Sequence, residues 1–143
     1  MGGANLGANR AAIVFSQDSA PFTIFVLDDD ADLCAALRFS FELDGFAVET
    51  FESGEALAQW RDFPKNGCLV LDYWLPGMNG LDTLEVLRGR EVELPAILIT
   101  SNPRRYVRLR AAANGVRIIE KPLLSNALVD LIRRIDPRSA AEP

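Results

Sequence analysis

The sequence predicts an α/β fold in which a doubly wound sheet of five parallel strands carries helices on both faces. Three observations predict it. Short apolar runs alternate with amphipathic segments five times along the chain. Most of these runs are continuously apolar, which is typical of strands buried on both faces of a sheet. Polar residues follow several runs directly, where parallel strands present their carboxyl ends.

The five strands are predicted from apolar, β-branched runs separated by turn-forming residues. The first run is continuous from Phe22 to Leu27, whereas the second alternates between apolar and polar residues. The third and fourth runs are again continuous, and Pro95 marks the entry to the fourth. The predicted strands are residues 22–27, 46–51, 68–71, 96–100 and 116–119.

The five helices are predicted from apolar stripes and from capping residues. Leu33, Leu37 and Phe41 share one face of the first helix, and Gly45 ends it. Ser53 is a suitable N-cap for the second helix, and a proline lies in the first turn of the fourth. The predicted helices are residues 30–43, 54–60, 80–88, 103–113 and 123–135.

Five alternating units with right-handed crossovers leave few topologies, and the flavodoxin-like strand order 2-1-3-4-5 is the best candidate. Residues 22–135 are predicted to form the folded domain. Residues 1–21 are rich in Gly, Ala and Asn and are predicted to be a flexible N-terminal tail. Residues 136–143 are predicted to be a C-terminal tail or the start of a linker.

Composition excludes several classes of function. The net charge of −5 argues against nonspecific binding to nucleic acid. The chain has no histidine, so metal sites, catalytic triads and phosphorelay steps cannot use a histidine of this chain. Cys34 and Cys68 lack metal-type spacing and are predicted to be buried, reduced thiols. No apolar run approaches the roughly 20 residues that span a bilayer, and no signal peptide opens the chain, so a cytoplasmic location is expected.

Polar residues at the predicted strand ends form the candidate site. They are, in strand order, Asp28, Asp29 and Asp30, then Asp72, Thr100 and Lys121. Singly, each has an ordinary role as a helix cap, a turn residue or a solvated charge. Together, carboxylates at neighbouring strand ends repel each other unless a cation neutralises them, and Mg²⁺ prefers such oxygen ligands. A carboxylate can also act as a nucleophile and form an aspartyl phosphate.

These residues resemble a known family. Over residues 22–135 the chain is similar to the receiver domains of two-component response regulators, which include the chemotaxis regulators. The segment Asp-Tyr-Trp-Leu-Pro-Gly-Met-Asn-Gly from Asp72 to Gly80 matches the phosphoacceptor loop of that family. The other functional positions of the family are filled by Asp28, Asp29, Thr100, Lys121 and Pro122.

The resemblance implies a role for each matching residue. Asp72 would be the phosphoacceptor, Thr100 the switch residue, and Lys121 the contact to the phosphoryl group. A cis peptide bond would precede Pro122.

The same resemblance implies a metal site. The implied ion is Mg²⁺, with Mn²⁺ as the alternative. Its ligands would be the carboxylates of Asp29 and Asp72 and the backbone carbonyl of Trp74, while Asp28 would hold a metal-bound water or Lys121.

The implied function is that of a phosphorylation switch. A sensor histidine kinase or histidine phosphotransfer protein would supply the phosphoryl group, and the domain would catalyse its own phosphorylation and dephosphorylation rather than act as a conventional enzyme. The signal would leave through the fourth helix, fifth strand and fifth helix, as a homodimer or to an output partner. Neither membrane nor nucleic acid is an expected partner. The arginines predicted for this face are Arg104, Arg105, Arg108, Arg110 and Arg117, and a merely solvated helix face is the alternative.

One departure and several alternatives remain at this stage. Ile118 occupies the position where the family usually has a switch aromatic, so the aromatic half of the switch is in doubt. A degenerate receiver that binds partners without phosphorylation is therefore the main alternative. A flavodoxin-like cofactor site would need a phosphate-binding loop where Asp28 to Asp30 stand. A small-molecule phosphatase would need a general acid where Trp74 stands. The chain would be a stand-alone receiver or part of a protein with an output domain.

Overall fold

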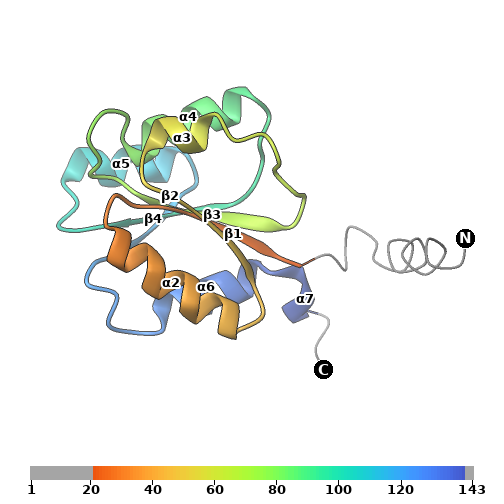
Figure 1. The fold of residues 1–143 in the computed structure, drawn as a ribbon. Helices are drawn as coiled ribbons and strands as arrows, with labels where there is room; N and C mark the ends of the chain where they lie inside the picture. The colour runs from red at the N-terminus through yellow and green to blue at the C-terminus, as the bar shows by residue number, and fades with distance from the viewer. Residues whose placement is uncertain (1–20, 141–143) are drawn as a thin grey trace, which may run out of the picture.

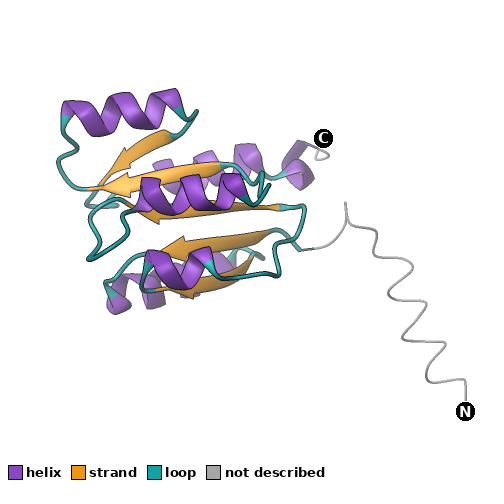
Figure 2. Cartoon of the chain, turned by 90° about the horizontal axis from the view of Figure 1, so that it is seen from above, coloured by secondary structure: helices purple, strands orange, loops and turns teal. Residues whose placement is uncertain are grey.

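The computed structural model describes residues 21–140, with side chains through Arg138. Five parallel strands form one sheet in the order β2-β1-β3-β4-β5, which confirms the predicted topology. The strands are β1 (Thr23–Leu27), β2 (Ala47–Phe51), β3 (Gly67–Asp72), β4 (Ala96–Thr100) and β5 (Arg117–Glu120). Figure 2 shows that all five strands run in one direction, so their carboxyl ends share one edge of the sheet.

Helices cover both faces of the sheet. They are α2 (Ala31–Leu43), α3 (Gly54–Ala58), α4 (Gly80–Gly89), α5 (Arg105–Ala113), α6 (Ala127–Ile135) and α7 (Pro137–Ala140). Helices α2, α6 and α7 lie on one face, and α3, α4 and α5 lie on the other (Figure 1). This is the three-layer arrangement expected when each parallel strand is followed by a crossover helix.

The alternation of side chains along the strands builds two apolar cores. In β1, Ile24 and Val26 belong to the core on the side of α2 and α6, whereas Phe25 and Leu27 belong to the core beneath α3, α4 and α5. The four side chains are almost completely buried, as are those of β3 between its two neighbours. Burial on both faces explains why the central strands read as unbroken apolar runs.

Two helices begin later than predicted. The helix predicted from residue 103 begins at Arg105, because Asn102 adopts a left-handed φ of 46° and the buried Pro103 precedes the N-cap. The helix predicted from residue 123 begins at Ala127, because the amide of Leu124 donates to the carbonyl of Pro122 and closes a turn first. Both delays leave irregular backbone next to the carboxyl ends of β4 and β5.

The predicted tails lie largely outside the described residues. This applies to residues 1–20 and 141–143, so the predicted domain boundaries stay predictions. Within the segment from residue 136, Asp136 is buried and pairs with Arg138 at 2.8 Å. The Arg138 guanidinium lies 5.6 Å from the centroid of the Phe46 ring. The start of the predicted tail therefore packs against the domain.

Other expectations are also met within the described part of the chain. Cys34 and Cys68 are free, buried thiols. Burial raises the pKa of Cys34 to about 11 and that of Cys68 to about 12, so neither is a reactive thiolate at neutral pH. Within residues 21–140, no helix combines the length and apolar character needed to cross a bilayer.

The two glycines at the ends of α4 give a matched test of the packing near Asp72. A Cβ atom at Gly80 would overlap with the carbonyl oxygen of Asp72, whereas one at Gly89 would meet no atom within 4 Å. We expect Gly80→Ala to lower the free energy of unfolding by about 1–3 kcal/mol through overpacking. Gly89→Ala should raise it by about 0.5–1 kcal/mol through helix propensity. Urea unfolding of both variants measures this, and equal effects would contradict the close approach of α4 to Asp72.

Candidate functional site

Three consecutive aspartates after β1 occupy three different environments. Asp28 is completely buried, and its amide donates to the carbonyl of Phe51 in the neighbouring strand β2. Asp29 is exposed. The side chain of Asp30 accepts from the amide of Leu33 at 3.1 Å and caps α2. The structural role of an acidic N-cap therefore falls to Asp30, which leaves Asp28 and Asp29 for the site.

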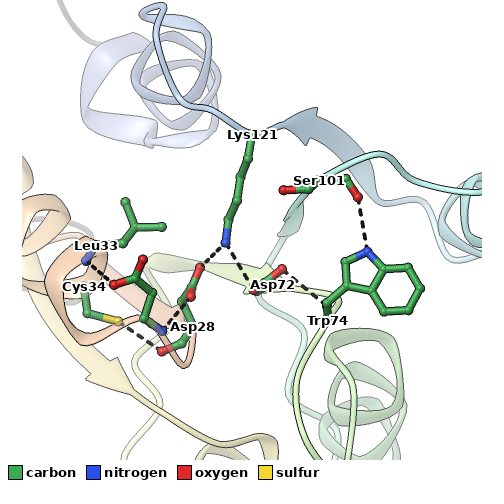
Figure 3. Close-up of polar contacts among 8 residues, drawn as sticks. Asp28, Leu33, Cys34, Asp72, Trp74, Ser101 and Lys121 are labelled. Carbon is green, nitrogen blue, oxygen red and sulfur yellow. Dashed lines mark hydrogen bonds and ion pairs between the residues drawn. The ribbon is translucent and has the colours of Figure 1, made fainter.

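Lys121 links the carboxylates of two strands (Figure 3). Its Nζ atom donates to Oδ2 of Asp28 at 2.7 Å and to Oδ2 of Asp72 at 3.2 Å. The peptide bond between Lys121 and Pro122 is cis, as the resemblance implied. The amide of Lys121 donates to the carbonyl of Thr100, which holds the end of β5 beside the end of β4. The structure thus brings four predicted site residues together from four different strand ends.

The electrostatics of the site are dominated by burial and by like charges. Burial, followed by repulsion from Asp28, raises the pKa of Asp72 to about 6, although Lys121 acts in the opposite direction. Burial alone would lower the pKa of Lys121, but its hydrogen bonds and attraction to Asp28 and Asp72 outweigh that effect and raise it. The ammonium therefore stays charged and compensates only part of the negative charge around it.

A cation fits the remaining negative charge. Carboxylate oxygens of Asp28, Asp29 and Asp72 lie within 4.8 Å of one another. This donor set consists only of hard oxygens, which is the chemistry that Mg²⁺ prefers. The residues present therefore fit a divalent metal ion without any rearrangement of strands.

Thr100 completes the site with an unsatisfied hydroxyl. Its side chain is fully buried, and Oγ1 has no hydrogen-bond partner among the described residues. Buried hydroxyl groups nearly always find partners, so an unpaired one suggests an acceptor that is absent from the resting protein. Thr100 lies at the end of β4, next to the strand that ends in Asp72, and its role as a switch residue stays a prediction.

Sequence reasoning missed the contacts that position the loop after Asp72. Oε2 of Glu55, in α3, accepts from the amide of Met78 at 3.1 Å. A Cβ atom at Gly54 would overlap with Thr83, so α3 packs closely against this loop and the start of α4. Gly54 and Glu55, which follow the predicted N-cap Ser53, were the available signal for these contacts. The sequence pattern did not indicate which residues they would contact.

Trp74 makes a second contact that the sequence did not predict. Its indole Nε1 donates to the carbonyl of Ser101 at 3.1 Å (Figure 3). Its amide lies 3.4 Å from Oδ1 of Asp72 and donates to it. Trp74 thus touches both Asp72 and the loop that follows Thr100.

The predicted basic face is less positive than the sequence indicates. Arg108 pairs with Glu120 at 2.7 Å, and Arg110 pairs with Asp82 and Glu85 at 2.8 and 2.9 Å. The remaining arginines of this face, Arg104, Arg105 and Arg117, are exposed. Ile118 lies in β5, the strand predicted for it, and is partly buried against the core beneath α5.

The raised pKa of Asp72 predicts a pH-dependent stability in metal-free protein. Its folded value of about 6 lies above the ordinary value of 3.8, so its contribution to stability is complete below about pH 4 and is lost as the pH rises through 6. Asp72→Asn removes the charge and should be more stable than wild type by about 1–3 kcal/mol at pH 7.5. The difference should shrink toward pH 4. Urea unfolding in EDTA across this range measures it, and a difference that does not change with pH would contradict the assignment.

Two buried threonines allow a matched test of the unpaired hydroxyl. Oγ1 of Thr83, which is also fully buried, donates to the carbonyl of Asn79 at 2.9 Å, whereas Oγ1 of Thr100 has no such partner. We expect Thr83→Val to lower the free energy of unfolding by about 1 kcal/mol, and Thr100→Val to leave it unchanged or raise it. Chemical denaturation compares the two, and an equal loss in both would show that the Thr100 hydroxyl is already satisfied.

Comparison with known proteins places this arrangement in a family. The profile of the response regulator receiver domain matches residues 24–133. The C4-dicarboxylate transport transcriptional regulatory protein DctD of Pseudomonas aeruginosa is 35% identical over 123 residues, which are 84% of this chain and 26% of DctD. The transcriptional regulatory protein FixJ of Rhizobium meliloti is 31% identical over 114 residues, which are 79% of this chain and 56% of FixJ. The chain thus spans only about a quarter to just over half of these relatives.

Solved structures share the fold. A crystal structure of FixJ-N matches with a TM-score of 0.71 and 28% identity, covering 85% of this chain and 96% of that one. The response regulator TrrA from Thermotoga maritima, in complex with Mg²⁺-BeF, matches with a TM-score of 0.69 and 21% identity, covering 80% of this chain and 98% of that one. The family profile, the strand order and the matching structures together show that this chain belongs to the receiver domains of two-component response regulators.

Proposed function

We propose that the chain accepts a phosphoryl group on Asp72 in the presence of Mg²⁺ and thereby switches its output face. The observation that carries this proposal is the buried Asp72 carboxylate, contacted by the Lys121 ammonium and next in the sheet to the unpaired Thr100 hydroxyl. A nucleophile, a cation and an unused donor converge there, which is what phosphoryl transfer requires of a protein.

The chemistry is a transfer between two phosphoryl carriers. A carboxylate oxygen of Asp72 attacks the phosphorus of a phosphohistidine in the donor protein. The new O–P bond forms an acyl phosphate, while the N–P bond breaks and its electron pair returns to the imidazole of the donor. The Lys121 ammonium, 3.2 Å from Asp72, would contact the phosphoryl oxygens, and the Thr100 hydroxyl would donate to one of them. Attack of water on the phosphorus later releases phosphate and restores the carboxylate.

Asp29, Asp72 and the backbone carbonyl of Trp74 would hold the metal ion, with Asp28 acting through water. When bound, Mg²⁺ neutralises the negative charge that develops on the phosphoryl oxygens. Mn²⁺, which prefers the same oxygen ligands, is the alternative ion. The cluster of carboxylates within 4.8 Å and the Mg²⁺-BeF complex of the related fold of TrrA support this proposal. The surplus of negative charge around one ammonium supports it independently.

We place the phosphoryl donor on the rim beside Lys121. A cavity of about 370 Å³ opens there, lined by Asp30, Leu33, Ser101, Lys121, Pro122 and Leu123. Leu124, next to this rim, is 88% exposed, which is unusual for a large apolar side chain in water. A sensor histidine kinase or histidine phosphotransfer protein could cover this apolar rim while presenting its phosphohistidine to Asp72. We also propose that this chain acts in the cytoplasm.

The proposed output face consists of α5, β5 and α6. It lies next to Thr100, because β5 pairs with β4 in the sheet. Since Arg108 and Arg110 are neutralised, Arg104, Arg105 and Arg117 carry the positive charge that a partner or a second copy would meet. A shift of Thr100 toward a phosphoryl group would bias the conformation of this face.

The decisive experiment is phosphorylation by a small acyl phosphate with Mg²⁺, followed by intact-mass measurement. We expect one phosphate on the wild type and none on Asp72→Asn. Asp130→Asn, which changes an exposed aspartate of α6, is the matched control and should be phosphorylated like the wild type. EDTA should abolish the added mass. A phosphate that persists on Asp72→Asn would show that another residue is the acceptor, and the proposal would fail.

A further inference from the structure

The indole of Trp74 connects two loops that follow neighbouring strands. Trp74 lies in the loop between β3 and α4, and Ser101 lies in the loop between β4 and α5. The hydrogen bond from indole Nε1 to the Ser101 carbonyl measures 3.1 Å and is called the Trp74 latch here (Figure 3). The Trp74 side chain is 46% exposed, so burial of apolar surface alone does not explain its position.

The Trp74 end of the latch is fixed relative to Asp72. The amide of Trp74 donates to Oδ1 of Asp72, and its ring packs edge-on against the ring of Tyr73, with centroids 4.8 Å apart and an interplanar angle of 90°. Tyr73 is 7% exposed, and it belongs to the buried core that also contains Val107 and Ala111 of α5. The indole is therefore braced by a buried ring that belongs to the same core as α5.

The Ser101 end of the latch is coupled to the unpaired hydroxyl of Thr100. Ser101 directly follows Thr100, so a displacement of Thr100 moves the Ser101 carbonyl as well. Asn102 then adopts a left-handed φ of 46°, a conformation that asparagine adopts more readily than most L-residues. A phosphoryl oxygen on Asp72 would offer Oγ1 of Thr100 the acceptor that it lacks. A backbone movement of Thr100 toward that acceptor would displace the Ser101 carbonyl and strain the latch.

We propose that the Trp74 latch holds the loop between β4 and α5 in its resting position and opposes the shift of Thr100 toward a phosphorylated Asp72. Trp74 is then a positioning residue that sets how readily the switch turns on, and this role rests on the proposed function of Asp72. One neutral hydrogen bond of ordinary strength changes the ratio of resting to active protein by roughly two- to tenfold.

Trp74→Phe tests the latch, because it keeps an aromatic ring and the backbone carbonyl but removes the indole N–H. Trp60→Phe is the matched control. The indole of Trp60 also donates to a backbone carbonyl, that of Asp62 at 3.2 Å, but it lies in the connection between α3 and β3. Both substitutions lose one indole hydrogen bond, and only one of them involves the loop after Thr100.

The first readout is hydrogen exchange of the backbone amides of Ser101, Asn102, Arg104 and Arg105 in resting, metal-free protein. We expect exchange to become roughly two- to tenfold faster in Trp74→Phe and to stay unchanged in Trp60→Phe. Unchanged exchange in Trp74→Phe would show that the latch does not hold this loop and would overturn the inference without touching the proposed function.

The second readout is the affinity for beryllofluoride with Mg²⁺, a mimic of the phosphoryl group, measured by calorimetry. We expect Trp74→Phe to bind it roughly two- to tenfold more tightly than the wild type, with Trp60→Phe unchanged. Equal or weaker binding by Trp74→Phe would overturn the latch even if exchange is faster. Asp72→Asn should not bind beryllofluoride. If the wild type also failed to bind it, the result would contradict the proposed function and with it the latch.

Discussion

One ammonium group between two buried carboxylates is the interaction on which the rest of the site depends. Asp28 and Asp72 are almost fully removed from water, and an unpaired carboxylate in such a place would be protonated or would destabilise the fold. Lys121 contacts both and keeps the site ionic. It cannot compensate both, however, and Asp29 adds a third negative charge at the surface. The fold therefore has a standing surplus of negative charge at this position, which is the physical reason why a divalent cation fits there.

The strand order explains why a lysine directly after β5 suits the cation of the site. Strand β5 pairs with β4 at the edge of the sheet, and β4 separates it from β3. Adjacent strands lie about 4.8 Å apart, so a side chain from β5 must span about two strand spacings to reach Asp72. The long, unbranched stem of lysine covers most of that distance and the Asp72 side chain covers the rest, and the ammonium charge is shared between Asp28 and Asp72. The hydrogen bond from the Lys121 amide to the carbonyl of Thr100 fixes the backbone from which this side chain extends.

The sheet and the residues at its strand ends could be predicted from the sequence because both follow from short-range patterns. Buried parallel strands are unbroken apolar runs, and the chemistry of such folds lies where those runs end. Residue patterns alone did not separate Asp28, Asp29 and Asp30, because three identical residues differ only in their place relative to the end of β1. The family resemblance did separate Asp28 from Asp29, and the structure shows the contact of Asp28 with Lys121 that it implied. The starts of α5 and α6 were missed, since turns around Asn102 and Pro122 override a helical pattern that continues through them.

Contacts between loops are the part of the site that sequence patterns cannot supply. Glu55 and Met78 are 23 residues apart, and Trp74 and Ser101 are 27 apart, so only the packed sheet brings them together. The contact of Trp74 changes how Ile118 is interpreted. An aliphatic residue on β5 would weaken a switch that relies on an aromatic there. In this chain, Trp74 already contacts the loop after Thr100, and Tyr73 belongs to the core that also contains Val107 of α5. A connection from Asp72 toward α5 through these aromatic residues would therefore need no aromatic residue on β5.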